Sequence, residues 1–226
     1  MQRPEGQHDR GGADGPLRVL VVDDHTLFRT GLRNLLEDEG FEVAEARSGE
    51  LALQAAAVRQ PDVVLMDLNM PGISGVEATR RLEELSPGTP VVMLTVSADD
   101  RDVVDAVRAG ACGYLLKDAA IEEIVAGIHA VASGESWVAP RVAGALIARV
   151  REASEPAGDA TPAAELTERE QQILRLIAEG KDNTEIGHEL YISPRTVKNH
   201  VSSLLAKLQI ENRIQAAVYA VRRGLV

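Results

Sequence analysis

Short apolar runs alternate with amphipathic stretches along the chain up to residue 133. Five of the runs predict strands, and four of the five are nearly continuous in apolar residues, as in a parallel sheet covered on both faces. The five are LRVLVV (17–22), FEVAEA (41–46), DVVLM (62–66), PVVML (90–94) and GYLL (113–116). Between them, apolar residues recur at helical spacing in 26–38, 74–85, 99–109 and 120–132. Strands alternating with helices in this way predict a doubly wound α/β domain.

The pattern changes after this domain. A further helix is predicted over 140–151, and a linker rich in Ala, Pro, Glu and Asp follows over 152–165. The rest of the chain contains only helical patterns, in four short segments with tight connections. We therefore expect a disordered tail (1–16), the α/β domain (17–133), a helical extension with a linker (134–165) and an all-α domain (166–226).

Composition and charge distinguish the two domains further. The 226 residues are 45% apolar, which is enough for real cores, and the formal net charge is −11. That charge is unevenly spread, because residues 163–226 hold 9 Lys+Arg against 8 Asp+Glu. We expect the two domains to have different partners. No apolar run is long enough to cross a membrane and the N-terminus is not a secretory signal, so we expect a soluble, cytoplasmic protein without a membrane partner.

Polar residues follow four of the predicted strands. Asp23 and Asp24 follow the first strand, Asp67 the third, Thr95 the fourth and Lys117 the fifth. If the strand order is the flavodoxin-like 2-1-3-4-5, these carboxyl ends surround one crevice, which is where open parallel sheets bind ligands. Taken singly, each residue has an ordinary structural interpretation, such as a helix cap or a surface charge. Their joint occurrence at four appropriate strand ends favours a site.

The charges of these residues indicate its chemistry. Three carboxylates in one crevice repel one another, and a hard divalent cation such as Mg²⁺ relieves that repulsion. An aspartate flanked by Mg²⁺ and the ammonium of Lys117 can attack a phosphoryl group and form an acyl phosphate. The hydroxyl of Thr95 can donate to a phosphate oxygen. We assign His25 to the surface, because the expected ion prefers oxygen ligands.

The motifs DD, MDLNMPGISG, LT and GYLLK, each at the end of its strand, resemble the receiver domain of bacterial two-component response regulators. The resemblance covers about 17–133 and implies that a sensor histidine kinase phosphorylates Asp67. It also implies roles for the neighbouring residues. Mg²⁺ would be held by Asp23, Asp24, Asp67 and the backbone carbonyl of Asn69, Lys117 would pair with the phosphate, and Thr95 and Tyr114 would form a switch pair.

The segment SPRTVKNHVSSLLAKL predicts a helix that begins with the cap Ser193 and Pro194. Its exposed face is small, polar and basic, with no acidic residue. Such a helix can enter the major groove of DNA. The segments TEREQQILRLIAEG and NTEIGHEL precede it, as in a helix-turn-helix. The exposed face consists of Arg195, Asn199, Ser202, Ser203 and Ala206, with Lys198 at its edge.

Residues 166–221 resemble the LuxR-type DNA-binding domain of NarL/FixJ regulators. Gly187 and His188 depart from that pattern, because an alanine and a variable residue are usual there. The resemblance implies binding to double-stranded DNA as a homodimer that reads an inverted repeat. Lys198 and Asn199 would approach base edges, with Arg195 on the same face, and Thr196, Ser202, Lys181 and Lys207 would lie at phosphates. Two copies would pair through Ile214, Ala217, Val218 and Val221.

Together these features predict a transcription regulator controlled by phosphorylation, with homodimerisation on activation, and not an enzyme acting on a separate substrate. Two alternatives remain open. A Mg²⁺-dependent phosphotransferase or phosphatase would need a carboxylate two positions after the nucleophile, where Asn69 stands. A phosphorylation-independent DNA-binding regulator would have a degenerate receiver, against which the full acidic set and Lys117 argue.

Overall fold

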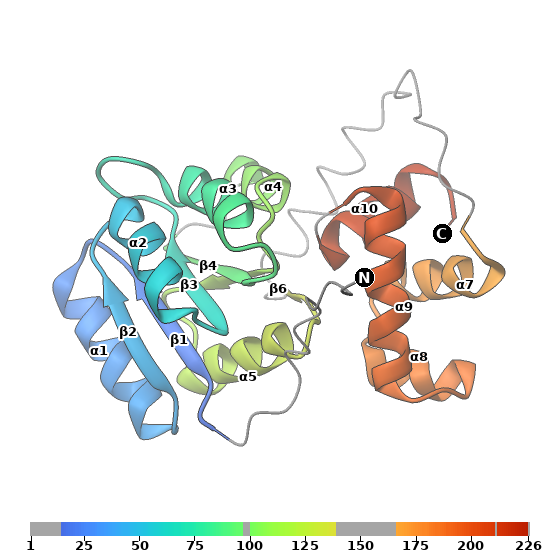
Figure 1. The fold of residues 1–226 in the computed structure, drawn as a ribbon, viewed down its shortest axis with the longest axis horizontal. Helices are drawn as coiled ribbons and strands as arrows, with labels where there is room; N and C mark the ends of the chain where they lie inside the picture. The colour runs from blue at the N-terminus through green and yellow to red at the C-terminus, as the bar shows by residue number, and fades with distance from the viewer. Residues whose placement is uncertain (1–14, 97–99, 139–165, 211, 226) are drawn as a thin grey trace, which may run out of the picture.

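The computed structural model describes residues 15–96, 100–138, 166–210 and 212–225 (Figure 1). The helix expected over 140–151, the linker over 152–165 and all but the end of the expected tail lie outside these residues. The described chain forms an α/β domain followed by a helical domain, as the hydrophobic pattern predicts. None of the helices in this described part combines the length and the apolarity that crossing a membrane requires.

The α/β domain contains a parallel sheet of six strands in the order β2-β1-β3-β4-β5-β6. The five expected strands and their order are confirmed, and nearly every residue of β1, β3, β4 and β5 is buried. The expected strand number was wrong by one. The strands are β1 (Arg18–Val22), β2 (Glu42–Ala46), β3 (Val63–Asp67), β4 (Val91–Thr95), β5 (Gly113–Leu116) and β6 (Trp137–Val138).

The sixth strand was missed because two residues are too few to show a periodicity. It pairs with β5 through the register Gly113↔Trp137, and the Trp137 amide donates to the Cys112 carbonyl at 3.2 Å. The Trp137 ring packs where a side chain at Gly127 would otherwise stand, since a Cβ there would lie 3.1 Å from Cδ1 of the indole. The sheet thus continues beyond residue 133, where we expected the domain to end.

Five helices cover the two faces of the sheet. Two of them, α1 and α5, pack side by side on one face, and the other three form a row on the opposite face (Figure 1). Ser48 and Ser74 cap the second and third helices by accepting hydrogen bonds from the Leu51 and Glu77 amides. The helices are α1 (Thr26–Asp38), α2 (Gly49–Arg59), α3 (Gly75–Leu85), α4 (Asp100–Arg108) and α5 (Ile121–Ala132).

The helical domain has the four expected helices and its own aliphatic core. Capping boxes at Thr167 and Asp182 start the first two helices, and Ser193 caps the third, with Pro194 in its first turn as expected. The helices are α7 (Glu168–Ala178), α8 (Asn183–Leu190), α9 (Pro194–Leu208) and α10 (Arg213–Arg222).

The turn between α8 and α9 explains the unusual Gly187. A Cβ at this position would lie 2.7 Å from the carbonyl oxygen of Ile192, closer than side chains approach backbone oxygens. The same turn is closed by a hydrogen bond from the Ile192 amide to the Gly187 carbonyl at 2.9 Å. In this chain the glycine therefore permits a tighter helix-turn-helix than an alanine would.

Candidate functional site

The polar residues at the strand ends lie together, as expected. Asp67 and Thr95 are the last residues of β3 and β4, whereas Asp23 and Lys117 directly follow β1 and β5. The topology brings all four ends to one edge of the sheet. Asp23, Asp67 and Thr95 are buried, with 1%, 3% and 0% of their surfaces exposed. A carboxylate cluster at this depth is stable only if cations neutralise it.

Lys117 supplies one of these cations. Its Nζ lies 2.5 Å from Oδ2 of Asp23 and 2.8 Å from Oδ2 of Asp67, so the ammonium bridges β1 and β3. The same ammonium stands 4.9 Å from the centre of the Phe28 ring of α1, which holds it over the crevice. Arg29 of α1 donates to the Asp23 carbonyl at 2.7 Å and fixes the backbone of the acidic pair.

The cluster retains capacity for a metal ion. Asp23, Asp24, His25 and Asp67 each offer a ligand atom, and these atoms lie within 4.8 Å of one another. Oδ1 of Asp24 is buried and accepts no hydrogen bond, although His25 Nδ1 is 3.0 Å away. A buried carboxylate oxygen without a donor is suited to a cation, and the three carboxylates form the oxygen-rich set that hard divalent ions prefer. His25, to which we gave no metal role, lies at the rim with its side chain 72% exposed.

Burial and charge act in opposite directions on the ionisation of this cluster. Burial raises the pKa of Asp67 above its ordinary value, and the hydrogen bond and charge of Lys117 only partly offset that rise. For Lys117, burial alone would lower the pKa, but the carboxylates of Asp23 and Asp67 raise it overall. The ammonium of Lys117 therefore stays charged, while the ionised form of Asp67 lowers the stability of the folded state. A second cation would reduce that cost.

The segment between β3 and the start of α3 packs closely against the backbone of Asp67. A Cβ at Gly75 would lie 2.0 Å from the Asp67 carbonyl oxygen, so only glycine fits this position of the MDLNMPGISG motif. Asn69 is exposed, and its backbone donates a hydrogen bond to the Asp67 carboxylate. Tyr114 lies on β5 beside β4, in register with Met93, and is buried with 1% of its surface exposed.

The helical domain presents α9 with the expected two faces. Val197, Val201 and Leu204 are buried. Thr196 is half-buried and its hydroxyl lies 2.8 Å from that of Ser193, at the cap. The exposed residues of α9 are Pro194, Arg195, Lys198, Asn199, Ser202, Ser203 and Ala206.

Two of the lysines expected at phosphates have acidic partners inside the domain. Lys207 pairs with Glu170 at 2.7 Å, and Lys181 contacts both Glu179 and Glu189. A phosphate contact by either lysine would have to share the ammonium with these carboxylates. The role of both lysines at DNA stays a prediction.

The residues expected to pair two copies lie along α10. Ala217 packs against the core of the helical domain, whereas Ile214 is buried and belongs to neither hydrophobic core. Val218 is half-buried and Val221 is 38% exposed. Ile214, Val218 and Val221 recur at helical spacing and belong to neither described core, so they form an apolar face of α10.

Both domains match known families. The chain matches the response regulator receiver domain over residues 19–129 and the luxR family of bacterial regulatory proteins over 164–220. The transcriptional regulatory protein LiaR of Bacillus subtilis (strain 168) is 43% identical over 212 residues, which cover 93% of this chain and 99% of LiaR. The chain belongs to the response regulators that join a receiver domain to a LuxR-type DNA-binding domain.

Other relatives agree with this membership of the response regulator family. The nitrate/nitrite response regulator protein NarL of Escherichia coli (strain K12) is 38% identical over 206 residues, covering 90% of this chain and 94% of NarL. The crystal structure of the response regulator ChrA of a heme-sensing two-component system is 36% identical with a TM-score of 0.51. It covers 94% of this chain and 100% of the ChrA chain.

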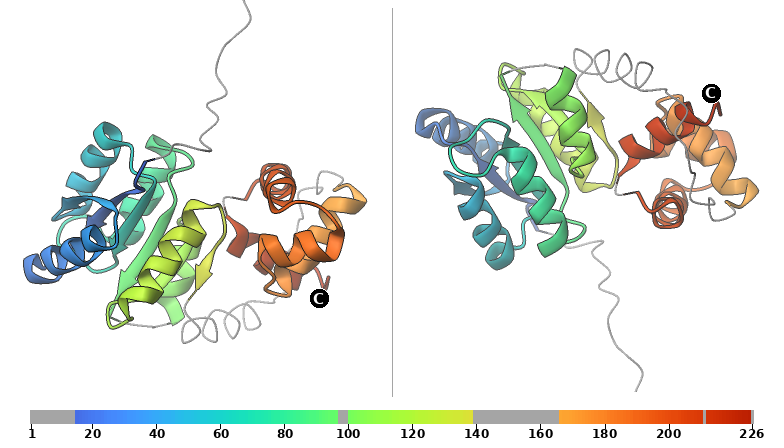
Figure 2. Two further views of the ribbon diagram at one scale, coloured as in Figure 1. Left: turned by 90° about the horizontal axis from the view of Figure 1, so that it is seen from below. Right: turned by 90° about the horizontal axis from the view of Figure 1, so that it is seen from above.

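In this response regulator the receiver contacts the DNA-binding domain through α10, which lies against the β6 side of the sheet (Figure 2). Asn212 Nδ2 donates to the Ala111 carbonyl at 3.1 Å and Gln215 Nε2 donates to the Val107 carbonyl at 2.8 Å. Glu135, after α5, accepts a hydrogen bond at 3.3 Å from the Asn183 amide at the start of α8. Its charge also opposes the desolvation of buried Arg213.

These contacts reach α9, the helix expected to enter the major groove, which we call the recognition helix. Cε of Lys198 lies 3.0 Å from where a Cβ at Gly134 would stand, so the lysine expected to read bases lies beside the receiver. Sequence reasoning missed Glu135, Asn212 and Gln215. No signal in the sequence marks them, because they are ordinary polar residues that meet partners about a hundred positions away in α4 and the following loop, or about fifty away at α8.

Proposed function

We propose that this protein is a cytoplasmic response regulator in which a sensor histidine kinase phosphorylates Asp67, and that phosphorylation controls dimerisation and sequence-specific DNA binding. One observation carries the proposal: a buried carboxylate on β3 shares its crevice with the ammonium of Lys117 and with the unbonded Asp24 oxygen. This arrangement suits attack on phosphorus between two cations better than it suits a structural ion pair.

The residues present fit Mg²⁺. Asp23, Asp24, Asp67 and the backbone carbonyl of Asn69 would hold the ion, which supplies positive charge against the phosphoryl oxygens. An oxygen of Asp67 forms the bond to phosphorus while the bond from phosphorus to the histidine nitrogen of the kinase breaks. Lys117 then contacts the phosphate, and Thr95 donates its hydroxyl to another phosphate oxygen, with Tyr114 behind it. The phosphate adds a charge of about −1.5 to −2 to the crevice at neutral pH.

Control of DNA binding would act through α10 and α9. The receiver occupies the start of α10 and lies beside Lys198, so this arrangement leaves neither the apolar face of α10 nor the recognition helix fully free. Release of the receiver would free Lys198 and Asn199 for bases, and Ile214, Val218 and Val221 for a second copy. Two recognition helices in such a dimer would lie about 34–36 Å apart, one turn of DNA.

The experiment that tests the function is DNA binding with and without a phosphodonor. Acetyl phosphate with Mg²⁺ should raise the affinity of the full chain for genomic fragments in a gel shift. Equal affinity with and without the phosphodonor, for a protein shown to carry the phosphate, would contradict phosphorylation control while leaving DNA binding intact.

Mg²⁺ should stabilise the unphosphorylated protein through Asp24. At ten times its dissociation constant, the ion should raise the free energy of unfolding by about 1.4 kcal/mol, because it binds only the folded crevice. Asp24→Asn should remove most of this gain in thermal unfolding monitored by calorimetry. Asp38→Asn, at an exposed aspartate of α1, is the control and should keep the full gain. An undiminished gain in Asp24→Asn would show that the ion binds elsewhere.

Asn212→Ala combined with Gln215→Ala should open the domain contact without phosphate. Each hydrogen bond contributes about 0.5–1.5 kcal/mol, so losing both should raise the DNA affinity of the unphosphorylated protein by roughly fivefold to a hundredfold. Fluorescence anisotropy with labelled DNA measures the affinity. Emission of Trp137, the one tryptophan of the chain, reports the change near Glu135.

Gln171→Ala is the matched control for the open variant, because Gln171 lies on α7 and donates only within its own domain, to the Leu166 carbonyl. It should leave both the affinity and the tryptophan emission unchanged. If the double variant behaves like this control, the contact does not restrain DNA binding.

A further inference from the structure

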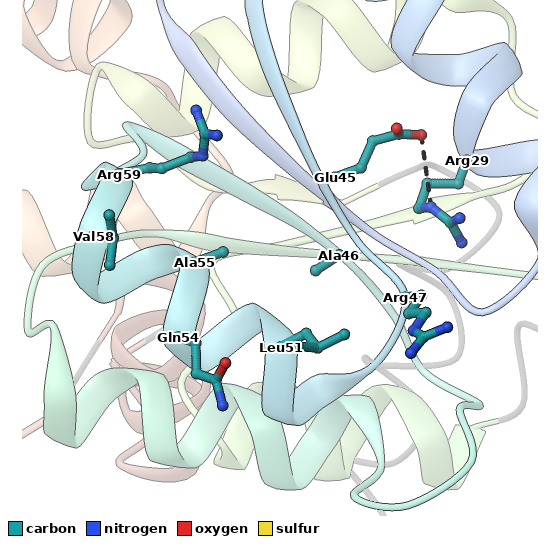
Figure 3. A pocket seen from close by; sticks show the side chains of 9 residues that line it. All are labelled: Arg29, Glu45, Ala46, Arg47, Leu51, Gln54, Ala55, Val58 and Arg59. Carbon is teal, nitrogen blue, oxygen red and sulfur yellow. Dashed lines mark ion pairs between the residues drawn. The ribbon is translucent and has the colours of Figure 1, made fainter.

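The β2 edge of the sheet carries a groove that the proposed phosphoryl chemistry does not use (Figure 3). We call it the β2 groove. Its volume is about 510 Å³, and it is lined by the end of β2, the start of α1 and one side of α2. It therefore wraps around an edge strand between the two helices that flank that strand.

The floor of the groove offers backbone hydrogen-bonding groups. Among the described strands β2 pairs with β1 alone. The Glu42 amide donates to the Leu17 carbonyl at 3.0 Å, and the Ala46 carbonyl accepts from the Asp23 amide at 3.1 Å, so these alternate residues face β1. The pleat then turns the backbone groups of Val43 and Glu45 outward. An extended segment could pair with them as an added strand.

The charge of the groove is opposite to that of the chain. Three arginines and one glutamate line it, although the chain as a whole carries −11. Arg29 is engaged with Glu45 at 3.6 Å. The side chains of Arg47 and Arg59 form no hydrogen bond or ion pair with a described residue, and they lie near opposite ends of α2 (Figure 3). Two uncommitted guanidinium groups suit two carboxylates.

The wall between the two arginines is apolar and open to solvent. Val58 is 84% exposed and Leu51 is 37% exposed, and both lie on the side of α2 that lines the groove. A lone exposed apolar residue needs no explanation, but here two of them accompany an open strand edge and uncommitted charges. The groove thus offers three kinds of contact in one place.

We propose that the β2 groove is a docking site for an extended acidic segment of a partner protein, which adds as a strand to β2. Its carboxylates would pair with Arg47 and Arg59, and an apolar residue between them would pack on Leu51 and Val58. The 11 residues of α2 span about 16 Å. An extended chain rises about 3.3 Å per residue and alternate side chains share a face, so two carboxylates on one face that span this length should stand about six residues apart.

The plainer interpretation is that the charges protect a strand edge from aggregation. A synthetic peptide of the stated chemistry, acetyl-Gly-Asp-Thr-Val-Thr-Val-Thr-Asp-Gly-amide with a fluorescent label, separates the two, because its aspartates and valines share one face of an extended strand. We expect it to bind the full-length chain in anisotropy titrations and to protect the amides of β2 from hydrogen exchange. A peptide with lysines in place of both aspartates should bind roughly tenfold more weakly, since both ion pairs become repulsive.

The double variant Arg47→Glu with Arg59→Glu should weaken binding of the acidic peptide by roughly tenfold and favour the lysine peptide instead. Arg175→Glu, at an exposed arginine of α7, is the matched control and should bind like the wild type. Absence of binding, or equal binding by both peptides, would overturn the proposal. So would a change in the sedimentation of the double variant without peptide, because the occupant would then be a second copy. The assay needs neither phosphate nor DNA, so its outcome is independent of the proposed function.

Discussion

Asp67→Asn should abolish phosphoryl uptake from acetyl phosphate in the presence of Mg²⁺, and with it the gain in DNA affinity. The amide oxygen that replaces the carboxylate is neutral and a poor nucleophile, so no acyl phosphate can form. Intact-protein mass spectrometry measures the uptake, since one phosphoryl group adds a fixed mass. We expect uptake in the wild type and none detectable in the variant over the same time.

Asp67→Asn should remain folded, so the loss of phosphoryl uptake can be attributed to the missing carboxylate. Because burial raises the pKa of Asp67, the ionised side chain opposes folding above that pKa, and a neutral amide removes this cost at neutral pH. Lys117 keeps Asp23 as its partner. Asp38→Asn is the control and should take up phosphate normally. If Asp67→Asn took up phosphate at the same rate as the wild type, the acceptor would be another residue and the proposal for Asp67 would be wrong.

The strands and the crevice were predictable because their causes are local. Short, valine-rich apolar runs such as VVLM favour buried strands, and an aspartate directly after such a run then lies at the carboxyl end of its strand. The strand order of the first five was taken from the flavodoxin-like arrangement and is confirmed. The meeting of Asp23, Asp67 and Lys117 then follows from the topology alone.

What could not be predicted depends on contacts between distant residues. The strand β6 pairs with β5 while the Trp137 ring packs beside Gly127 of α5, and no run of two residues reveals these contacts. The steric need for Gly75 appears only when the Asp67 carbonyl is placed 2.0 Å from its missing Cβ. The domain contact made by Asn212 joins parts of the chain that share no pattern.

Glu170 was not singled out in the sequence either, yet the recognition helix depends on it. The side chain is 3% exposed and lies in the first turn of α7. It accepts hydrogen bonds from the Thr167 amide at 2.8 Å and from the Ser203 hydroxyl at 2.9 Å, and it pairs with Lys207 at 2.7 Å. One carboxylate therefore caps α7 and fastens α9 to it.

The ionisation of Glu170 determines the pH range over which this side chain stabilises the contact between α7 and α9. Burial alone would raise its pKa, but Lys207, Thr167 and Ser203 together lower it to about 2 from 4.5. A lowered pKa in the folded state means that the stabilisation is fully present above about 4.5 and is lost as the pH falls toward about 2. We expect the helical domain to lose stability over that acid range.

Glu170→Ala should lower the free energy of opening of the helical domain by about 2–3 kcal/mol at neutral pH, because Lys207 loses its partner and α7 loses its cap. Hydrogen exchange of the α7 and α9 amides measures this domain separately from the receiver. Glu168→Ala is the control, since Glu168 is exposed in the same first turn, and it should cost much less. The variant should also lose the acid dependence of the wild type between about pH 4.5 and 2. If exchange in α9 is equal in the two variants, Glu170 does not hold the recognition helix, and the positions of Lys198 and Asn199 depend on the apolar core alone.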